Sequence, residues 1–210
     1  MRIRVTFSKT GPLVYIGNLD LLTIWERTAR RASLPLAYSH AFHPQPKIHL
    51  AAPLPLGFSS RAEVLDMRLN EGVATTGLEA RLQAALPDGI SVIEIRPMEL
   101  DEPELQNQVT SAEYEVSLTA DVDVQDLERK IAAMLGAETC PRERRGKSYD
   151  LRPLIEKLEL ASGPTTSRPK IRMRLSAREG ATGRPDEVLE ALGFRREAAR
   201  IERTGLVFRA

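Results

Sequence analysis

The chain has three histidines, His40, His43 and His49, which lie within ten residues of one another. Histidine titrates near neutrality, so its ring can bind a metal ion or transfer a proton. A metal site needs three or four ligands, but residues 27–62 contain no carboxylate and the only cysteine, Cys140, is distant in the sequence. The residue types therefore predict no metal ion and no other cofactor.

These histidines still allow one kind of catalysis. A histidine beside basic side chains can take a proton from a ribose 2′-hydroxyl, as a metal-independent endoribonuclease would require. No partner that would orient the ring of His40 or His43 is visible in the sequence. The simpler interpretation is that these are solvated loop histidines that touch a phosphate or another ligand.

A basic helix face is the second candidate. A helix expected over residues 18–33 carries an apolar face that includes Leu21 and Trp25, and arginines lie on its other side. Glu26 can pair with Arg30 four residues later. Arg27 and Arg31 have no acidic residue four positions before them, so with Arg2, Arg4, Lys9 and Lys47 they could contact phosphate. The alternative is that this is an ordinary solvated helix face.

A basic segment over residues 142–152 is the third candidate, with Tyr149 inside it. A short basic loop beside an aromatic ring suits single-stranded RNA, whose phosphates pair with cations and whose bases stack. Aromatic residues make up only 5% of the chain, which argues against an extended stacking surface.

The sequence lacks the motifs of the common nucleotide-binding and nucleophilic enzymes. It contains no G-x-G-x-x-G and no G-x-x-x-x-G-K-[ST]. Its formal charge is +1, but residues 1–60 carry +5, residues 61–140 carry −11 and residues 141–210 carry +7. Such asymmetry creates a local potential that attracts a polyanion or a charged protein.

Composition indicates a soluble, cytoplasmic protein without membrane contact. Apolar residues make up 42% of the 210, enough for a real core. No run approaches the ~20 apolar residues that span a bilayer, and residues 1–7 alternate in polarity instead of forming a signal peptide.

The first half of the chain predicts the order β-α-β-β-α-β. Ile3, Val5 and Phe7 alternate with polar residues, which is typical of a strand. Thr76 and Glu79 match a capping box. The expected strands cover residues 2–8, 34–39, 62–69 and 90–98, with further extended chain at 48–52 and a proline-rich loop at 41–47.

The second half repeats this order. Asp123 is expected to cap a helix, Pro185 to begin another and Gly193 to end it. Residues 201–208 are expected to end the chain as a strand or as a hairpin around Thr204 and Gly205. Residues 99–110 are acidic and polar, as in a linker. The fold class expected is α+β, with two tandem ferredoxin-like (βαββαβ) domains over residues 1–100 and 111–210 and antiparallel sheets.

Several blocks resemble a known bacterial family: FSKTGPLVYIGNLDL at 7–21, RRASLPLAYS at 30–39, FHPQPK at 42–47, PLPLG at 53–57 and KSYDLRPL at 147–154. The chain is similar to radical-SAM-linked proteins of unknown function, which stand alone or are fused C-terminal to a radical-SAM enzyme. The resemblance implies an accessory role beside such a partner. The chain departs from the family's usual Gly, Asn and Arg at Ala41, His43 and Gln45, which argues against an essential catalytic His43.

We therefore expect a non-catalytic accessory module that binds RNA or presents a substrate to a radical-SAM enzyme. The alternatives are the endoribonuclease and a pure protein-interaction partner that uses the acidic middle of the chain. The loops Lys9–Gly17 and Phe42–Lys47 are expected to meet beside the start of the first helix, with Phe42 either exposed for docking or packed in the core. The expected binding residues are Lys9, Tyr15, Arg27, Arg31, His40, Phe42, His43, Lys47, Arg144, Arg145, Lys147 and Arg152.

Overall fold

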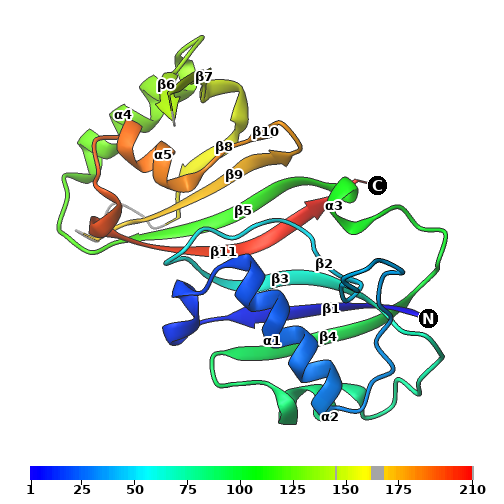
Figure 1. Cartoon of the computed structure of the whole chain (residues 1–210). Helices are drawn as coiled ribbons and strands as arrows, with labels where there is room; N and C mark the ends of the chain where they lie inside the picture. Colours follow the sequence, from blue (N-terminus) through cyan, green and yellow to red (C-terminus); the bar gives the residue numbers. More distant parts are fainter. Residues whose placement is uncertain (145, 162–167, 210) are drawn as a thin grey trace. The chain divides into compact units, whose positions relative to one another are not determined.

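The computed structural model describes residues 1–144, 146–161 and 168–209, which form two compact units (Figure 1). The first unit covers Met1–Val109 and the second covers Thr110–Ala210. Both are mixed α/β structures with antiparallel strands and few helices. None of the helices in the described part of the chain is both long and apolar enough to cross a membrane.

The first unit is a four-stranded antiparallel sheet with its helices connecting the strands. Its sheet order is β4-β1-β3-β2. Its elements are β1 (Arg2–Lys9), η1 (Gly11–Tyr15), α1 (Asn18–Arg31), β2 (Ile48–Leu50), β3 (Ser59–Arg68), α2 (Leu78–Ala85), β4 (Ile90–Met98) and α3 (Leu105–Gln108).

The core of the first unit lies between one face of this sheet and helices α1 and α2. Strand alternation turns Ile3, Val5 and Phe7 to that face, as the sequence predicts. Trp25 of α1 meets Phe7 edge to face, with ring centroids 4.9 Å apart. Leu82 of α2 belongs to the same cluster, so both helices cover the same side.

Two local predictions for the first unit are wrong. Residues 34–39 form only isolated bridges, Leu36 to Leu69 and Tyr38 to Pro46, and the second strand is β2. The capping box does not form, because α2 begins after Gly77 in a left-handed conformation and no side chain caps it. A backbone carbonyl, that of Thr75, accepts from the amide of Leu78 instead.

The other face of the first sheet holds a buried ionic cluster. Arg2 and Arg4, which the sequence places among the phosphate-binding residues, are 1% and 6% exposed and both pair with Asp66. Arg2 also donates to the carbonyls of Glu102 and Pro103, at 2.8 and 2.9 Å. Residues 99–110 are therefore not a free linker, since part of this segment packs over the cluster and includes α3.

The second unit has the sheet order β8-β9-β5-β11, with the short β10 also beside β9. A separate hairpin, β6–β7, is inserted between α4 and β8. The elements are β5 (Val109–Leu118), α4 (Val124–Gly136), β6 (Pro141–Arg144), β7 (Lys147–Asp150), η2 (Arg152–Leu154), β8 (Ile155–Leu160), β9 (Lys170–Arg178), β10 (Ala181–Thr182), α5 (Pro185–Ala191), η3 (Arg196–Ala198) and β11 (Ala199–Phe208).

The helix ends predicted from the sequence of the second half are correct. Asp123 caps α4 by accepting from the amides of Gln125 and Asp126. Pro185 opens α5, and Gly193 follows its end at φ 89°. Of the two alternatives for residues 201–208, the strand is correct and the hairpin is not, because β11 runs through Thr204 and Gly205 as one strand.

A candidate anion-binding pocket in the second unit

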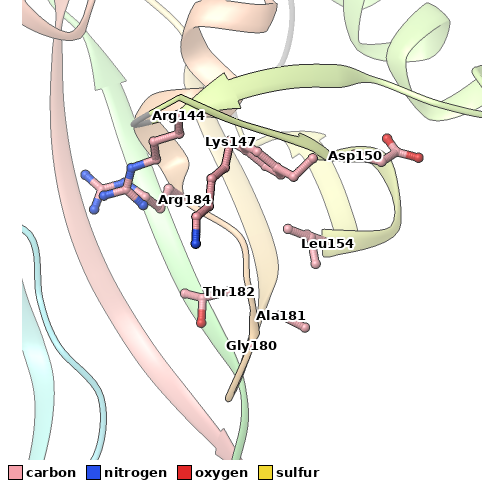
Figure 2. Close-up of a pocket in the computed structure, with 9 residues that line it drawn as sticks. Arg144, Lys147, Asp150, Leu154, Gly180, Ala181, Thr182 and Arg184 are labelled. Carbon is pink, nitrogen blue, oxygen red and sulfur yellow. The ribbon is translucent and has the colours of Figure 1, made fainter.

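A cavity of about 430 Å³ opens beside the inserted hairpin. Figure 2 shows the cationic side chains of Arg144, Lys147 and Arg184 near one another and Leu154 and Ala181 across the opening from Arg144. The residues that line it are Arg144, Lys147, Tyr149, Asp150, Leu154, Gly180, Ala181, Thr182 and Arg184.

The β6–β7 hairpin positions two of the cations. Arg144 and Lys147 are the last partners in its register, on either side of the turn. Gly146 in that turn has φ 73°, a left-handed conformation that glycine adopts without a steric penalty. Arg145, the other turn residue and one of the expected binding residues, lies outside the described residues.

The base of the hairpin is held by Asp150 and Arg152. One carboxylate oxygen of Asp150 accepts from the amides of Cys140 and Arg152, at 2.7 and 3.0 Å. The guanidinium of Arg152 donates to the carbonyls of Leu135 and Ile155. Arg152 was expected to bind ligand, but it does not line the pocket and its donors are committed to the backbone. Its role here is structural.

The opposite wall comes from the β9–β10 hairpin and the chain that follows it. Gly180 has φ 71° in the tight turn between the two strands. At Gly183 a Cβ atom would lie 3.1 Å from the carbonyl oxygen of Leu154 and 3.1 Å from the Cβ of Leu175, so the backbone passes close to both. This close packing fixes the backbone just before Arg184, the residue that precedes α5.

The three cations differ in how strongly the protein neutralises them. Arg184 forms two hydrogen bonds to Asp186, at 3.0 and 2.6 Å. Burial alone would lower the pKa of Arg184, but the hydrogen bond to Asp186 together with the negative charges of Asp186 and Glu187 outweighs burial, so the pKa of Arg184 is raised. Arg144 is 4.0 Å from Glu187. Lys147 forms no ion pair with any residue that the structure describes, so it has the most capacity to bind an anion.

Tyr149 adds an uncharged aromatic ring to this pocket. Burial raises the pKa of its hydroxyl to about 12, and the negative charge of Glu187 together with a hydrogen bond to Glu187 adds to the effect. The phenol therefore stays protonated across the physiological range. It gives the pocket a neutral surface on which a ring or alkyl group can pack.

The expected N-terminal site takes a different form. Phe42 is 94% exposed, so the interpretation of Phe42 as a core plug is wrong. Its ring contacts His43 edge to face, with centroids 4.8 Å apart. Ser39 donates from its amide to Gln45 O and its hydroxyl accepts from the amide of Gln45, so the loop is closed at its base.

The loops carrying Lys9 and Lys47 lie at opposite ends of the first sheet. Lys9 pairs with Ser60 in the β1–β3 register, whereas the carbonyl of Lys47 accepts from Arg68, which pairs with Arg2. Strand β1 advances by seven residue steps from Arg2 to Lys9, and a strand rises ~3.3 Å per residue, so the two ends of β1 are about 23 Å apart. The expectation that both loops meet at one site is wrong, because the Phe42 loop precedes β2 instead of following a second strand.

The remaining expected residues on the first unit are scattered. Arg27 and Arg31 are exposed on α1, and Tyr15 is exposed at the end of η1. Lys9 is only 1% exposed, so it cannot reach a surface polyanion as expected. His40 and His43 are exposed. In the described part of the chain, no three His, Cys, Asp or Glu side chains are grouped as metal ligands.

Sequence reasoning missed Arg184, Leu154 and Ala181. Gly180 and Pro185 did indicate a turn followed by the start of a helix, so the sequence predicts that the chain changes direction here. Nothing in the sequence indicated that this turn faces the β6–β7 hairpin, about forty residues earlier in the chain.

Comparisons with known proteins give the family but little on activity. No curated protein matches the chain significantly. One similar solved chain comes from the crystal structure of the archaeal box H/ACA sRNP Nop10-Cbf5 complex, with a TM-score of 0.43 and 14% sequence identity. The match covers 96% of this chain and 46% of the solved chain, so this protein spans less than half the length of that chain. A TM-score this low does not establish a shared fold. The family described as "Uncharacterized protein conserved in bacteria" (DUF2344) matches residues 2–185, and the chain belongs to this family.

Proposed function

We propose that this protein is a non-catalytic RNA-binding accessory module whose second unit holds phosphate groups in the pocket beside the β6–β7 hairpin. The observation that supports this most is the presence of Arg144, Lys147 and Arg184 on one small concave surface. Cations paired with phosphate supply most of the affinity of nucleic-acid binding. The aromatic ring of Tyr149 beside them suits an unpaired base better than a duplex.

We also propose that each unit is a ferredoxin-like domain and that the boundary lies near residue 109. The alternating order of strands and helices supports this for the first unit. The same order occurs in the second unit once the β6–β7 hairpin is treated as an insertion. In this arrangement the pocket lies between the inserted hairpin and the β9–β10 side of the common framework.

The partner we propose is a radical-SAM enzyme, to which the module brings an RNA substrate. The similarity of residues 7–21, 42–47 and 147–154 to radical-SAM-linked proteins supports this partner. The docking element we propose is the loop around Phe42, because a 94% exposed aromatic ring on a closed loop is a suitable anchor for a hydrophobic contact.

RNA binding is tested by titrating a fluorescent single-stranded RNA of mixed sequence with the whole protein and measuring anisotropy. If three cations contact phosphate, affinity should fall about tenfold or more between 50 and 200 mM salt. The double variant Arg144→Ala/Lys147→Ala should weaken binding and flatten this salt dependence. Absence of binding, or binding that salt does not change, would refute the proposal.

The matched control is Arg129→Ala/Lys157→Ala. Both residues belong to the second unit, are 75% and 60% exposed, and pair with Asp126 and Glu159 away from the pocket. The control removes the same two charge types, so an equal loss of binding in both double variants would mean that only net charge matters.

The partner is tested by recovering a radical-SAM enzyme with tagged protein after nuclease treatment, which Phe42→Ser should prevent.

A further inference from the structure

We propose that the pocket of the second unit recognises a nucleotide bearing a phosphate monoester, as found at the end of an RNA strand or in a free nucleoside monophosphate, and not an internal phosphodiester. This inference rests on the proposed RNA-binding function and names the chemical group that the site selects. It follows from the pocket's size, its charge and the separation of its polar and apolar walls.

The size of the pocket suits a single nucleotide. Its volume of about 430 Å³ falls within the ~300–1,000 Å³ of small-molecule sites. Proteins that hold a continuous single strand instead use a long basic groove that follows ~4–16 nucleotides. The residues lining this pocket come from two hairpins, one short turn and the start of α5, and they surround a short, open depression and not a long groove.

Among the cations of the lining, Lys147 is the one that the protein leaves unneutralised. Asp186 pairs with Arg184 and Glu187 lies 4.0 Å from Arg144, whereas Lys147 forms no ion pair with any residue that the structure describes. The carboxylate, Asp150, lies across the opening from Arg144 and Arg184 in Figure 2, and one of its oxygens already accepts from two backbone amides. A phosphate monoester carries about −1.5 to −2 at neutral pH, and each internal diester carries one negative charge. The ammonium of Lys147 therefore attracts the monoester more strongly than an internal diester.

The apolar wall suits the nucleoside that carries this phosphate. Leu154 and Ala181 lie across the opening from Arg144 and Arg184 in Figure 2. Tyr149 lines the same cavity with a neutral phenol. A base packed against these side chains would leave its phosphate within reach of Lys147 and Arg144, as stacking and charge pairing require together.

The test compares one short RNA sequence with a 5′-phosphate, with a 3′-phosphate and with hydroxyl groups at both ends. The whole protein should bind one of the phosphorylated forms about tenfold more tightly than the hydroxyl form, which is the effect of one additional charge-assisted hydrogen bond. Lys147→Ala should remove this preference, whereas Lys157→Ala, which removes an exposed lysine paired with Glu159, should preserve it. Circular dichroism of both variants checks that they fold.

Free adenosine 5′- and 3′-monophosphate, with adenosine as the control, form the second arm of the test. Equal binding of all three RNAs that Lys147→Ala still weakens would overturn this inference and leave RNA binding intact. Binding of a monophosphate without binding of any RNA would overturn the proposed function and support a free nucleotide as the ligand. Failure of every probe would overturn both.

Discussion

At the scale of single residues, the buried carboxylate of Asp66 organises one face of the first unit. Arg2 donates to it from Nε at 2.9 Å, and Arg4 from Nε at 2.8 Å. All three side chains are at most 7% exposed. Removal of charges from water is unfavourable, and such a cluster is tolerated only because each charge has a partner and further hydrogen bonds. Loss of the one carboxylate would leave two arginines buried without their counter-ion.

We therefore expect Asp66→Asn to lower the free energy of unfolding by about 3–5 kcal/mol, the usual cost of breaking a buried ion pair from one side. Urea denaturation followed by circular dichroism measures this. Glu104→Gln is the control, because Glu104 pairs with Arg68 at a half-exposed position and such pairs contribute ~0–1 kcal/mol. Equal, small losses in both variants would mean that the Asp66 cluster does not stabilise the fold.

At the scale of elements, short turns determine where the strands begin and where the pocket forms. The β6–β7 hairpin, the β9–β10 hairpin and the turn before β4 each contain a glycine at positive φ: Gly146, Gly180 and Gly89. Gly89 is the most constrained of the three. A Cβ atom there would lie 2.7 Å from the carbonyl oxygen of Thr10, and Gly89 O accepts from the amide of Thr10 at 2.8 Å.

Gly89→Ala is expected to lower the free energy of unfolding by about 2 kcal/mol or more, because a residue with a Cβ is strained at this φ and its methyl group would overlap the backbone of Thr10, directly after β1. Gly136→Ala is the matched control, since no atom lies within 4 Å of its Cβ position and its φ is not positive. The control should be neutral or stabilising by up to ~1 kcal/mol. Chemical denaturation of both variants compares them, and a tolerated Gly89→Ala would contradict the role of this turn.

At the scale of the whole molecule, folding pairs charges that the sequence separates into blocks. The acidic block at residues 61–140 supplies Asp66 to Arg2 and Arg4, and Glu113 to Arg174. By unit the charge is nearly even, with −1 over residues 1–109 and +2 over residues 110–210. The long-range potential expected from the blocks is therefore weakened, and an anion would be attracted by individual cations such as Lys147 that no described acid pairs with.

Each unit has its own buried core, so we expect residues 1–109 and 110–210 to fold when produced as separate chains. Domains of about 100 residues bury enough surface to be stable alone. Far-UV circular dichroism and a cooperative thermal transition for each chain would support this. A chain that shows no cooperative transition would contradict it and indicate that its core depends on the other unit.

The sequence by itself determined the elements whose signals are local. Alternation predicted the strand that contains Ile3, Val5 and Phe7, and Asp123 and Pro185 indicated where two helices begin. These signals are readable because side-chain period and helix capping involve residues within a few positions of each other. Another local feature, the clustering of basic residues at 142–152, identified Arg144 and Lys147 as candidate ligands.

Only the tertiary structure decided which charges are buried and which form a site. Arg2 and Lys9 look like surface cations in the sequence, yet both are 1% exposed. Arg184 gave no signal, yet it lines the same cavity as Arg144 and Lys147. The physical reason is that burial and convergence depend on contacts between segments far apart in the chain. A local pattern can indicate that a residue is charged, but the residue that lies opposite it is fixed only by the packing of the whole domain.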